Sequence, residues 1–165
     1  MRSAQTTRYR GNYVHLMKQT QEKEYNFNHQ MSIQIRFSDI DMLGHVNNAV
    51  YMNYFDMAKT KYFQAVHNAK NWSRLDVVVA NVSVDFLSPV FFNESIIVKT
   101  KITRLGNKSF DIIQQIELAD SGEIKTISRS VMVGFDISTN SSKPLTECWK
   151  EQVREFEGDI DKISF

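Results

Sequence analysis

Two aspartates, a histidine and two asparagines lie within ten residues of one another, and their types and spacing could support catalysis. In order, the residues of this stretch are Asp39, Asp41, Gly44, His45, Asn47 and Asn48. A carboxylate can activate water as a general base or attack a carbonyl carbon itself, and an imidazole exchanges protons near neutral pH. The stretch therefore carries a candidate base or nucleophile beside a proton-transfer group.

The residues after Gly44 predict the start of a helix that could stabilise negative charge. Gly44 can adopt a positive φ at little cost, which allows the chain to turn sharply. Asn47 or Asn48 can then act as N-cap and accept a hydrogen bond from an amide of the first helical turn. The remaining amides of that turn, with the helix dipole behind them, can bind the oxyanion that forms when a carbonyl is attacked.

Each of these residues has a simpler interpretation when it is considered alone. The aspartate would form an Asx turn, the asparagines would cap the helix, and the histidine would be structural or exposed. A calcium loop is a sharper rival, because Asp39, Asp41 and Gly44 match the opening of an EF-hand. However, Leu43 and Val50 occupy two positions at which that loop needs ligands, and no second His or Cys is nearby to complete a zinc site. We therefore expect neither a metal nor another cofactor.

Other hydrolytic nucleophiles are poorly supported. The chain has no Gly-x-Ser-x-Gly sequence of the kind that presents a catalytic serine. Its one cysteine, Cys148, has Lys150 as its basic neighbour and no adjacent histidine. The stretch that begins at Asp39 thus remains the candidate site.

Composition limits the classes of partner and compartment. The formal net charge of +1 gives no electrostatic footprint for nucleic acid. No apolar run approaches the length of a membrane span, and the N-terminus lacks the apolar core of a secretory signal. A single cysteine excludes an intramolecular disulfide and fits a reducing setting. We expect a soluble, cytoplasmic protein that binds neither nucleic acid nor membranes.

Apolar periodicity predicts the elements that would position the candidate site. A strand precedes it over 32–37, and one long helix follows it from about Asn48 to about His67. Further strands are predicted over 80–86, 96–105, 109–118 and 124–135, the last three as a meander. A closing helix begins after the cap Thr146. This order predicts an α+β fold in which a curled antiparallel sheet wraps around one long central helix, with edge strands that favour self-association.

The chain length predicts one folded domain. Residues 1–30 differ from the rest, because they contain five Lys or Arg against two acids and show little periodicity. We expect this segment to be a flexible or partner-docked extension, and we favour that over a transit peptide. The domain itself is expected over 31–165, including the C-terminal helix.

The quoted stretch is part of a longer pattern that resembles the signature of hotdog-fold acyl thioesterases. The pattern reads Asp39-x-Asp41-x-x-Gly44-His45-Val46-Asn47-Asn48-Ala49-x-Tyr51, followed by Tyr54-Phe55-Asp56-x-Ala58-Lys59-Thr60. It is similar to the 4-hydroxybenzoyl-CoA thioesterase-like and YbgC-like branch, over about 25–136. The resemblance implies a hotdog fold, hydrolysis of an acyl-CoA substrate to free acid and CoA, and assembly into a homodimer or homotetramer.

The resemblance also implies roles for individual residues. Asp41 would be the catalytic carboxylate, as general base or as nucleophile, and the backbone amide of Asn48 would polarise the thioester carbonyl. His45 matches an assisting histidine of related plant acyl-ACP thioesterases, although Leu43 stands where those enzymes have an assisting asparagine. Substrate contacts are implied for Gly44, Val46, Asn47, Asn48 and Tyr51.

Two alternatives to acyl-CoA hydrolysis remain open. The substrate could be a thioester of acyl carrier protein, or the domain could bind acyl thioesters without hydrolysing them. One carboxylate and one oxyanion donor can suffice for hydrolysis, because a thiol with a pKa of about 8.5 leaves without help from a strong general acid.

Charged residues outside the stretch receive less specific assignments. A phosphate site for CoA is conceivable at Lys99 and Lys101 on one strand face, with Arg104 and Lys108 at the far end of the strand. A solvated strand face is the interpretation that we favour. Asp56 is expected at the helix surface, paired with Lys59 or Thr60.

Overall fold

The structure, a computed structural model, describes residues 25–67, 76–158 and 160. Its elements are, in chain order, β1 (His29–Ile33), the 3-10 helix η1 (Phe37–Asp39), α2 (Asn48–His67), β2 (Val77–Phe86), β3 (Ile96–Leu105), β4 (Ser109–Leu118), β5 (Ile124–Asp136), β6 (Ser141–Ser142) and α3 (Glu147–Glu157). Residues 1–24 of the expected extension lie outside the described residues. Strand β1 begins at His29, so the sheet includes residues that the expectation had assigned to the extension.

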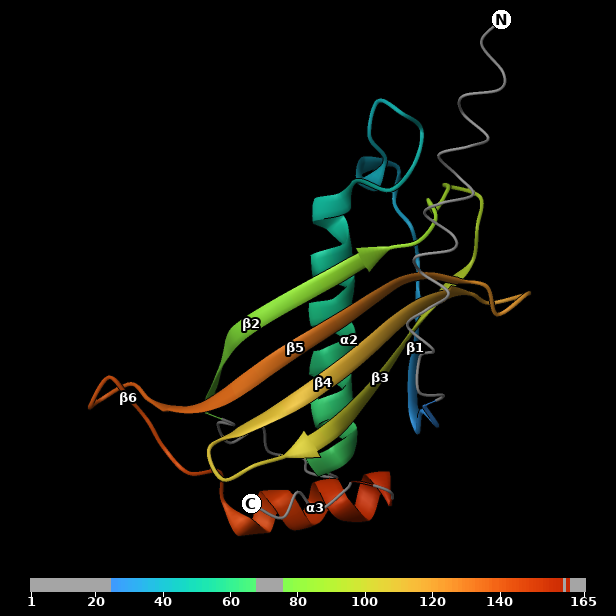
Figure 1. Cartoon of the computed structure of the whole chain (residues 1–165). Helices are drawn as coiled ribbons and strands as arrows, with labels where there is room; N and C mark the ends of the chain where they lie inside the picture. The colour runs from blue at the N-terminus through green and yellow to red at the C-terminus, as the bar shows by residue number, and fades with distance from the viewer. Residues whose placement is uncertain (1–24, 68–75, 159, 161–165) are drawn as a thin grey trace, which may run out of the picture.

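One antiparallel sheet forms the body of the fold. Its strand order is β1-β3-β4-β5-β2, with the short β6 paired to β5. Helix α2 lies along one face of the sheet, the strands cross it obliquely, and α3 lies near its C-terminal end (Figure 1). The predicted α+β architecture, a sheet curled around one long helix, is confirmed.

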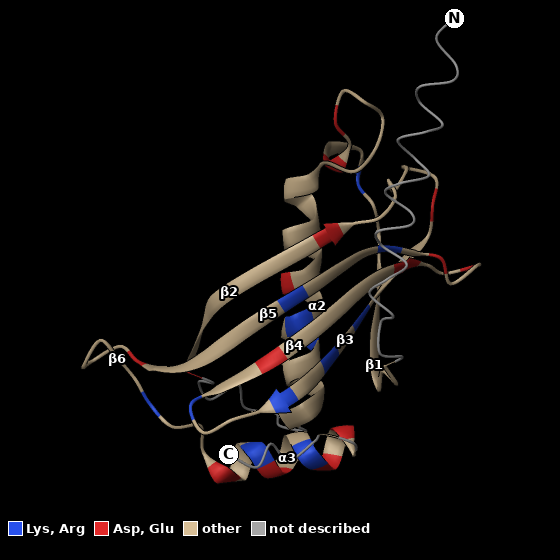
Figure 2. Cartoon of the chain, in the orientation of Figure 1, with Lys and Arg blue, Asp and Glu red and all other residues tan. Residues whose placement is uncertain are grey.

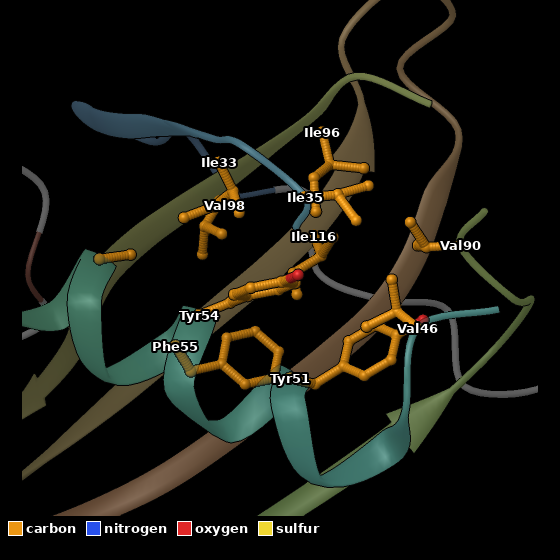
Figure 3. Close-up of a cluster of buried hydrophobic side chains, with 11 residues drawn as sticks. Ile33, Ile35, Val46, Tyr51, Tyr54, Phe55, Val90, Ile96, Val98 and Ile116 are labelled. Atoms are coloured by element: carbon orange, nitrogen blue, oxygen red, sulfur yellow. The ribbon is translucent and has the colours of Figure 1, made fainter. Parts of the chain in front are cut away.

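The core lies between α2 and the strands that it covers. The helix buries a stripe of residues at helical spacing, because positions three and four apart project from the same side. This stripe is Tyr51, Tyr54, Phe55, Ala58, Tyr62, Phe63 and Val66. Figure 3 shows the first part of it facing apolar side chains of β1, β3 and β4, such as Ile33, Val98 and Ile116.

Buried polar contacts at two places fix the helices on the sheet. The Gln114 side-chain amide donates to the Phe55 carbonyl of α2 over 2.9 Å, which ties the helix to β4. At the far end of α2, the Glu157 carboxylate of α3 accepts from the Tyr62 hydroxyl over 2.5 Å and from Lys101 Nζ over 3.0 Å. The predicted cap of α3 is confirmed, because the Thr146 side chain accepts from the amide of Trp149.

The structure differs from the predicted elements at the first two strands. The predicted strand over 32–37 included Phe37, but Phe37 lies in η1 and its side chain is 86% exposed. The reason is local: the Arg36 amide donates to the Asp39 carboxylate, which turns the chain into the 3-10 helix. The strand predicted over 80–86 begins earlier, at Val77, and apolar residues on both of its faces are 41–47% exposed: Val78, Val79 and Val82. Among the described residues β2 is an edge strand, paired with β5 alone.

Candidate active site

A short hairpin before α2 carries the central residues of the candidate site. The Asp41 amide donates to the His45 carbonyl over 2.9 Å, and the Gly44 amide donates to the Asp41 carbonyl over 3.0 Å. This pattern is a type I turn followed by a left-handed residue, and Gly44 supplies that residue with a φ of 81°. The predicted sharp turn at Gly44 is thus confirmed. Met42 and Leu43 form its tip and are exposed.

Asp41 and His45 lie side by side across this hairpin. Asp41 Oδ1 accepts from the amide of Leu43 over 2.8 Å, which is the Asx turn that the simpler interpretation predicts. Its second oxygen, Oδ2, lies 3.5 Å from His45 Nδ1, and that nitrogen is 3.3 Å from the Val46 carbonyl. Both side chains keep about a quarter of their surface exposed. One carboxylate oxygen therefore shapes the turn, and the other is available for chemistry beside an imidazole.

The start of α2 resolves which asparagine is the cap. Asn47 Oδ1 accepts from the Ala49 amide over 2.9 Å, so Asn47 is the N-cap and Asn48 the first helical residue. The amide of Asn47 donates to the Asp39 carbonyl, which attaches the helix start to η1. The amide of Asn48 donates to no group in the described part of the chain. It is the free helix-terminal donor that oxyanion binding requires.

Asp39, the first aspartate of the pair, is structural in this geometry. Its buried carboxylate accepts from the Tyr54 hydroxyl over 2.7 Å and from the Arg36 amide over 2.9 Å, and Arg36 also forms an ion pair with it. Burial alone would raise the pKa of Asp39, but these hydrogen bonds outweigh it and hold the pKa below its usual value. Burial also raises the pKa of Tyr54, with help from Asp39, so the hydroxyl remains a donor.

Replacement of Asp39 by Asn should lower the free energy of unfolding at pH 7 by about 2 kcal/mol, because charge-assisted bonds from Arg36 and Tyr54 are lost. The folded-state pKa of Asp39 is depressed, so its contribution is fully present above about pH 4 and is lost as the pH falls through the folded value. Urea unfolding of both proteins between about pH 2.5 and about pH 7 measures this difference. Equal stability at neutral pH would contradict the role.

The segment after β2 completes the surroundings of the hairpin. The Val46 amide donates to the Val90 carbonyl over 2.8 Å, and His45 and Phe91 form an isolated bridge. Tyr51, almost fully buried on α2, stands near Asp41 and Glu94, whose charges add to the effect of burial in raising its pKa. The described surroundings of Asp41 thus come from the hairpin, the start of α2 and the segment that begins at Val90.

The structure brings the predicted site residues together in different settings. Gly44 and Asn47 shape the hairpin and the helix start, Val46 is fully buried in the core, and Tyr51 lines the interior beneath the helix. Their contacts with substrate stay predictions. Sequence reasoning missed the structural role of Asp39; the spacing of three residues from Arg36 was the available signal.

Three of the four basic residues considered for a phosphate site form ion pairs, and Lys108 donates to the Ser142 hydroxyl. Figure 2 shows cationic and acidic positions side by side along β3, β4 and β5. Lys99 pairs with Glu117 at 2.5 Å and Arg104 with Asp111 at 2.6 Å, which gives no support to a phosphate site there. Lys101 is not on a solvated face as expected, because Glu157 of α3 buries it.

The expected surface pair on α2 is confirmed. Asp56 is 70% exposed and accepts from Lys59 Nζ over 2.7 Å. Within the described ranges, no three His, Cys, Asp or Glu side chains are grouped to hold a metal ion. Neither helix of the described chain is both long and apolar enough to cross a bilayer.

A sheet curled around one long helix, with a carboxylate hairpin at the helix N-terminus, defines a hotdog-fold protein, and comparison with known proteins agrees. A profile of the thioesterase-like superfamily matches residues 35–156. The chain belongs to this superfamily.

Individual relatives are also thioesterases. A thioesterase from Thermus thermophilus, solved in complex with coenzyme A and Zn, superimposes with a TM-score of 0.72 at 30% identity, over 81% of this chain and 96% of that chain. The long-chain acyl-CoA thioesterase FadM of Escherichia coli (strain K12) is 21% identical over 131 residues, which are 76% of this chain and 97% of FadM. A 1,4-dihydroxy-2-naphthoyl-CoA thioesterase from Synechocystis shares the fold, with a TM-score of 0.67 at 18% identity over 76% of this chain and 94% of that chain.

Proposed function

We propose that this protein hydrolyses acyl-CoA thioesters to the free acid and CoA. The observation that carries the proposal is the free amide of Asn48 at the start of α2, beside a hairpin that presents the second oxygen of Asp41. A carboxylate and an oxyanion donor are the two groups that attack on a thioester carbonyl needs. The Thermus thermophilus thioesterase complexed with coenzyme A, and the acyl-CoA thioesterase FadM, support this substrate class.

The reaction can follow two courses at Asp41. As a general base, Asp41 takes a proton from water, the water oxygen attacks the carbonyl carbon, and the oxyanion accepts from the Asn48 amide. The intermediate collapses, and the departing CoA thiolate takes the proton back from Asp41. As a nucleophile, Asp41 forms an anhydride, releases CoA thiolate, and is regenerated by water. His45, beside Oδ2, orients the carboxylate in either course.

Isotope labelling can identify the nucleophilic course, because only that course can place label in Asp41. In a single turnover in ¹⁸O-labelled water, a general base places the label in the released acid alone. A nucleophile whose anhydride is attacked by water at the Asp41 carbonyl carbon places the label in the Asp41 carboxylate. Mass spectrometry of the peptide that contains Asp41 reads the result.

The functional unit in this proposal is a homodimer built on β2. This edge strand exposes Val78, Val79 and Val82, and unpaired strand edges of this kind are stabilised by pairing with another chain. Antiparallel pairing of two β2 strands would continue the sheet across both copies. Sedimentation equilibrium should give twice or four times the 19.2 kDa chain mass. A monomer at micromolar concentration would contradict the dimer and leave the hydrolysis proposal standing.

A substrate screen tests the activity. Purified protein is incubated with straight-chain, branched and aromatic acyl-CoA thioesters, and a thiol reagent detects released CoA. The expected result is hydrolysis of at least one class above the buffer rate. Carrier-protein thioesters of the same acyl chains distinguish the alternative carrier. Tight binding of acyl-CoA without turnover of either thioester would instead establish a non-catalytic binding module.

A further inference from the structure

Thr126 of β5 is a fully buried hydroxyl without a partner. Its side chain has no exposed surface, and Oγ1 forms no hydrogen bond within the described part of the chain. A buried hydroxyl left in this state costs about 1–3 kcal/mol relative to a satisfied one. Such groups are rare in native proteins and call for a functional explanation or a bound molecule.

The strand register places Thr126 on the face of the sheet that α2 covers. Thr126 stands opposite Ile116 of β4, a core residue beneath the helix, and opposite Phe86 of β2. Residues directly opposite each other on neighbouring strands share a face. The Phe86 ring in turn lies 5.2 Å from the Tyr51 ring of α2, centroid to centroid. Thr126 therefore points into the space between α2 and the β5–β2 side of the sheet.

Buried hydroxyls continue along this face of β5, next to the partly exposed edge strand β2. Ser128 and Ser130 follow Thr126 on the same face of β5, because alternate strand residues share a face, and both are nearly buried. On β2, Val82 opposite Ser130 and Phe86 opposite Thr126 are more than 40% exposed, whereas Val84 opposite Ser128 is half-buried against the core. An acyl chain that reached this face from the β2 edge would meet hydroxyl groups as well as apolar side chains.

Thr126, the first of these β5 hydroxyls, is the one nearest to Tyr51 of the candidate active site. The Tyr51 hydroxyl lies near Thr126 and the Val90 carbonyl, both of which lower its pKa against the larger raising effect of burial, and the Asp41 charge also acts on it. Thr126 lowers the pKa of Tyr51 as a hydrogen-bonding neighbour does, but no well-formed hydrogen bond satisfies Thr126 Oγ1 in the described part of the chain. Two hydroxyls thus lie close together, and one of them, that of Tyr51, is within electrostatic reach of the Asp41 carboxylate.

We propose that Thr126 and Tyr51 bind an oxygen substituent of the acyl chain close to its thioester, so that the substrates are hydroxyacyl-CoA or oxoacyl-CoA esters. A hydroxyl donates to a keto oxygen and accepts from a hydroxyl, so both substituents fit. A site built to hydrogen-bond a substituent discriminates against the analogue that lacks it, because its own polar groups then remain unsatisfied. The inference rests on the proposed hydrolysis of acyl-CoA and specifies its substrates.

The test compares acyl-CoA esters of equal chain length that carry a 3-hydroxy group, a 3-oxo group or no substituent. The wild-type kcat/KM should be about tenfold higher for at least one oxygenated ester than for the plain ester. The isosteric change Thr126→Val should lower that ratio about tenfold, whereas Thr126→Ser, which keeps the hydroxyl, should retain it. Thr60→Val removes an exposed hydroxyl from α2 and should leave the ratio unchanged.

Each outcome separates this inference from the proposed hydrolysis. Equal kcat/KM for plain and oxygenated esters in the wild type overturns the inference and leaves hydrolysis intact, and this measurement does not depend on any variant folding. A preference that survives in Thr126→Val overturns the assignment to Thr126. If no ester is hydrolysed, the hydrolysis proposal fails. Calorimetric affinities for non-hydrolysable 3-oxoalkyl and plain alkyl thioethers of CoA then decide the inference, and equal values overturn it.

Discussion

Replacement of Asp41 by Asn should lower kcat/KM for the best acyl-CoA substrate about a thousandfold, within the usual range for loss of a catalytic base. The amide oxygen of Asn can still accept from the Leu43 amide, so the Asx turn and the hairpin should persist. An amide can neither take a proton from water nor attack a carbonyl. The free energy of unfolding should therefore change by less than about 0.5 kcal/mol. Thiol release and urea unfolding measure the two quantities.

Asp56 offers a matched control for this experiment. Asp56→Asn makes the same chemical change on α2, at an exposed residue whose partner is Lys59. Its kcat/KM should stay within about twofold of the wild type, because surface ion pairs contribute little. Full activity of Asp41→Asn would refute the catalytic role of Asp41. A loss of activity that accompanies a loss of stability would show that the carboxylate supports the fold.

Replacement of Asn48 by Pro should lower kcat about a hundredfold, because it removes the backbone amide proposed to bind the oxyanion. Asn48 is the first residue of α2, the helical position at which proline is best tolerated. Its amide forms no hydrogen bond with the described chain, so none is lost on substitution. Asn47, the cap, can keep its bond to the Ala49 amide, and caps adopt the extended backbone that proline requires of the residue before it.

Asn48→Ala is the control, since it removes the exposed side chain and retains the amide. It should keep kcat within about threefold of the wild type, and both variants should unfold at a similar temperature. If Asn48→Pro retained full activity while folded, the oxyanion would have to be bound elsewhere. If Asn48→Ala were equally impaired, the side chain and not the amide would be the functional group.

Local sequence patterns alone were enough to predict most of the fold and the position of the site. Helical spacing defines the buried stripe of α2, and alternation defines β3 to β5, because each pattern reflects the geometry of its own element. The turn at Gly44 and the cap beside it depend on residues a few positions apart, so their chemistry is also local. Asp41 was distinguished from Asp39 through the family resemblance, not by any local pattern.

Only the tertiary structure determined which polar groups have hydrogen-bond partners within the protein and which lack them. Asp39 is satisfied because Tyr54, fifteen residues away, reaches it across the start of α2. Thr126 is buried between Ile116 of β4 and Phe86 of β2, an outcome of register that no single segment encodes. The exposure of β2 likewise follows from its place at the sheet edge. Burial and hydrogen bonding between distant residues depend on packing, whereas periodicity records only which face of an element is apolar.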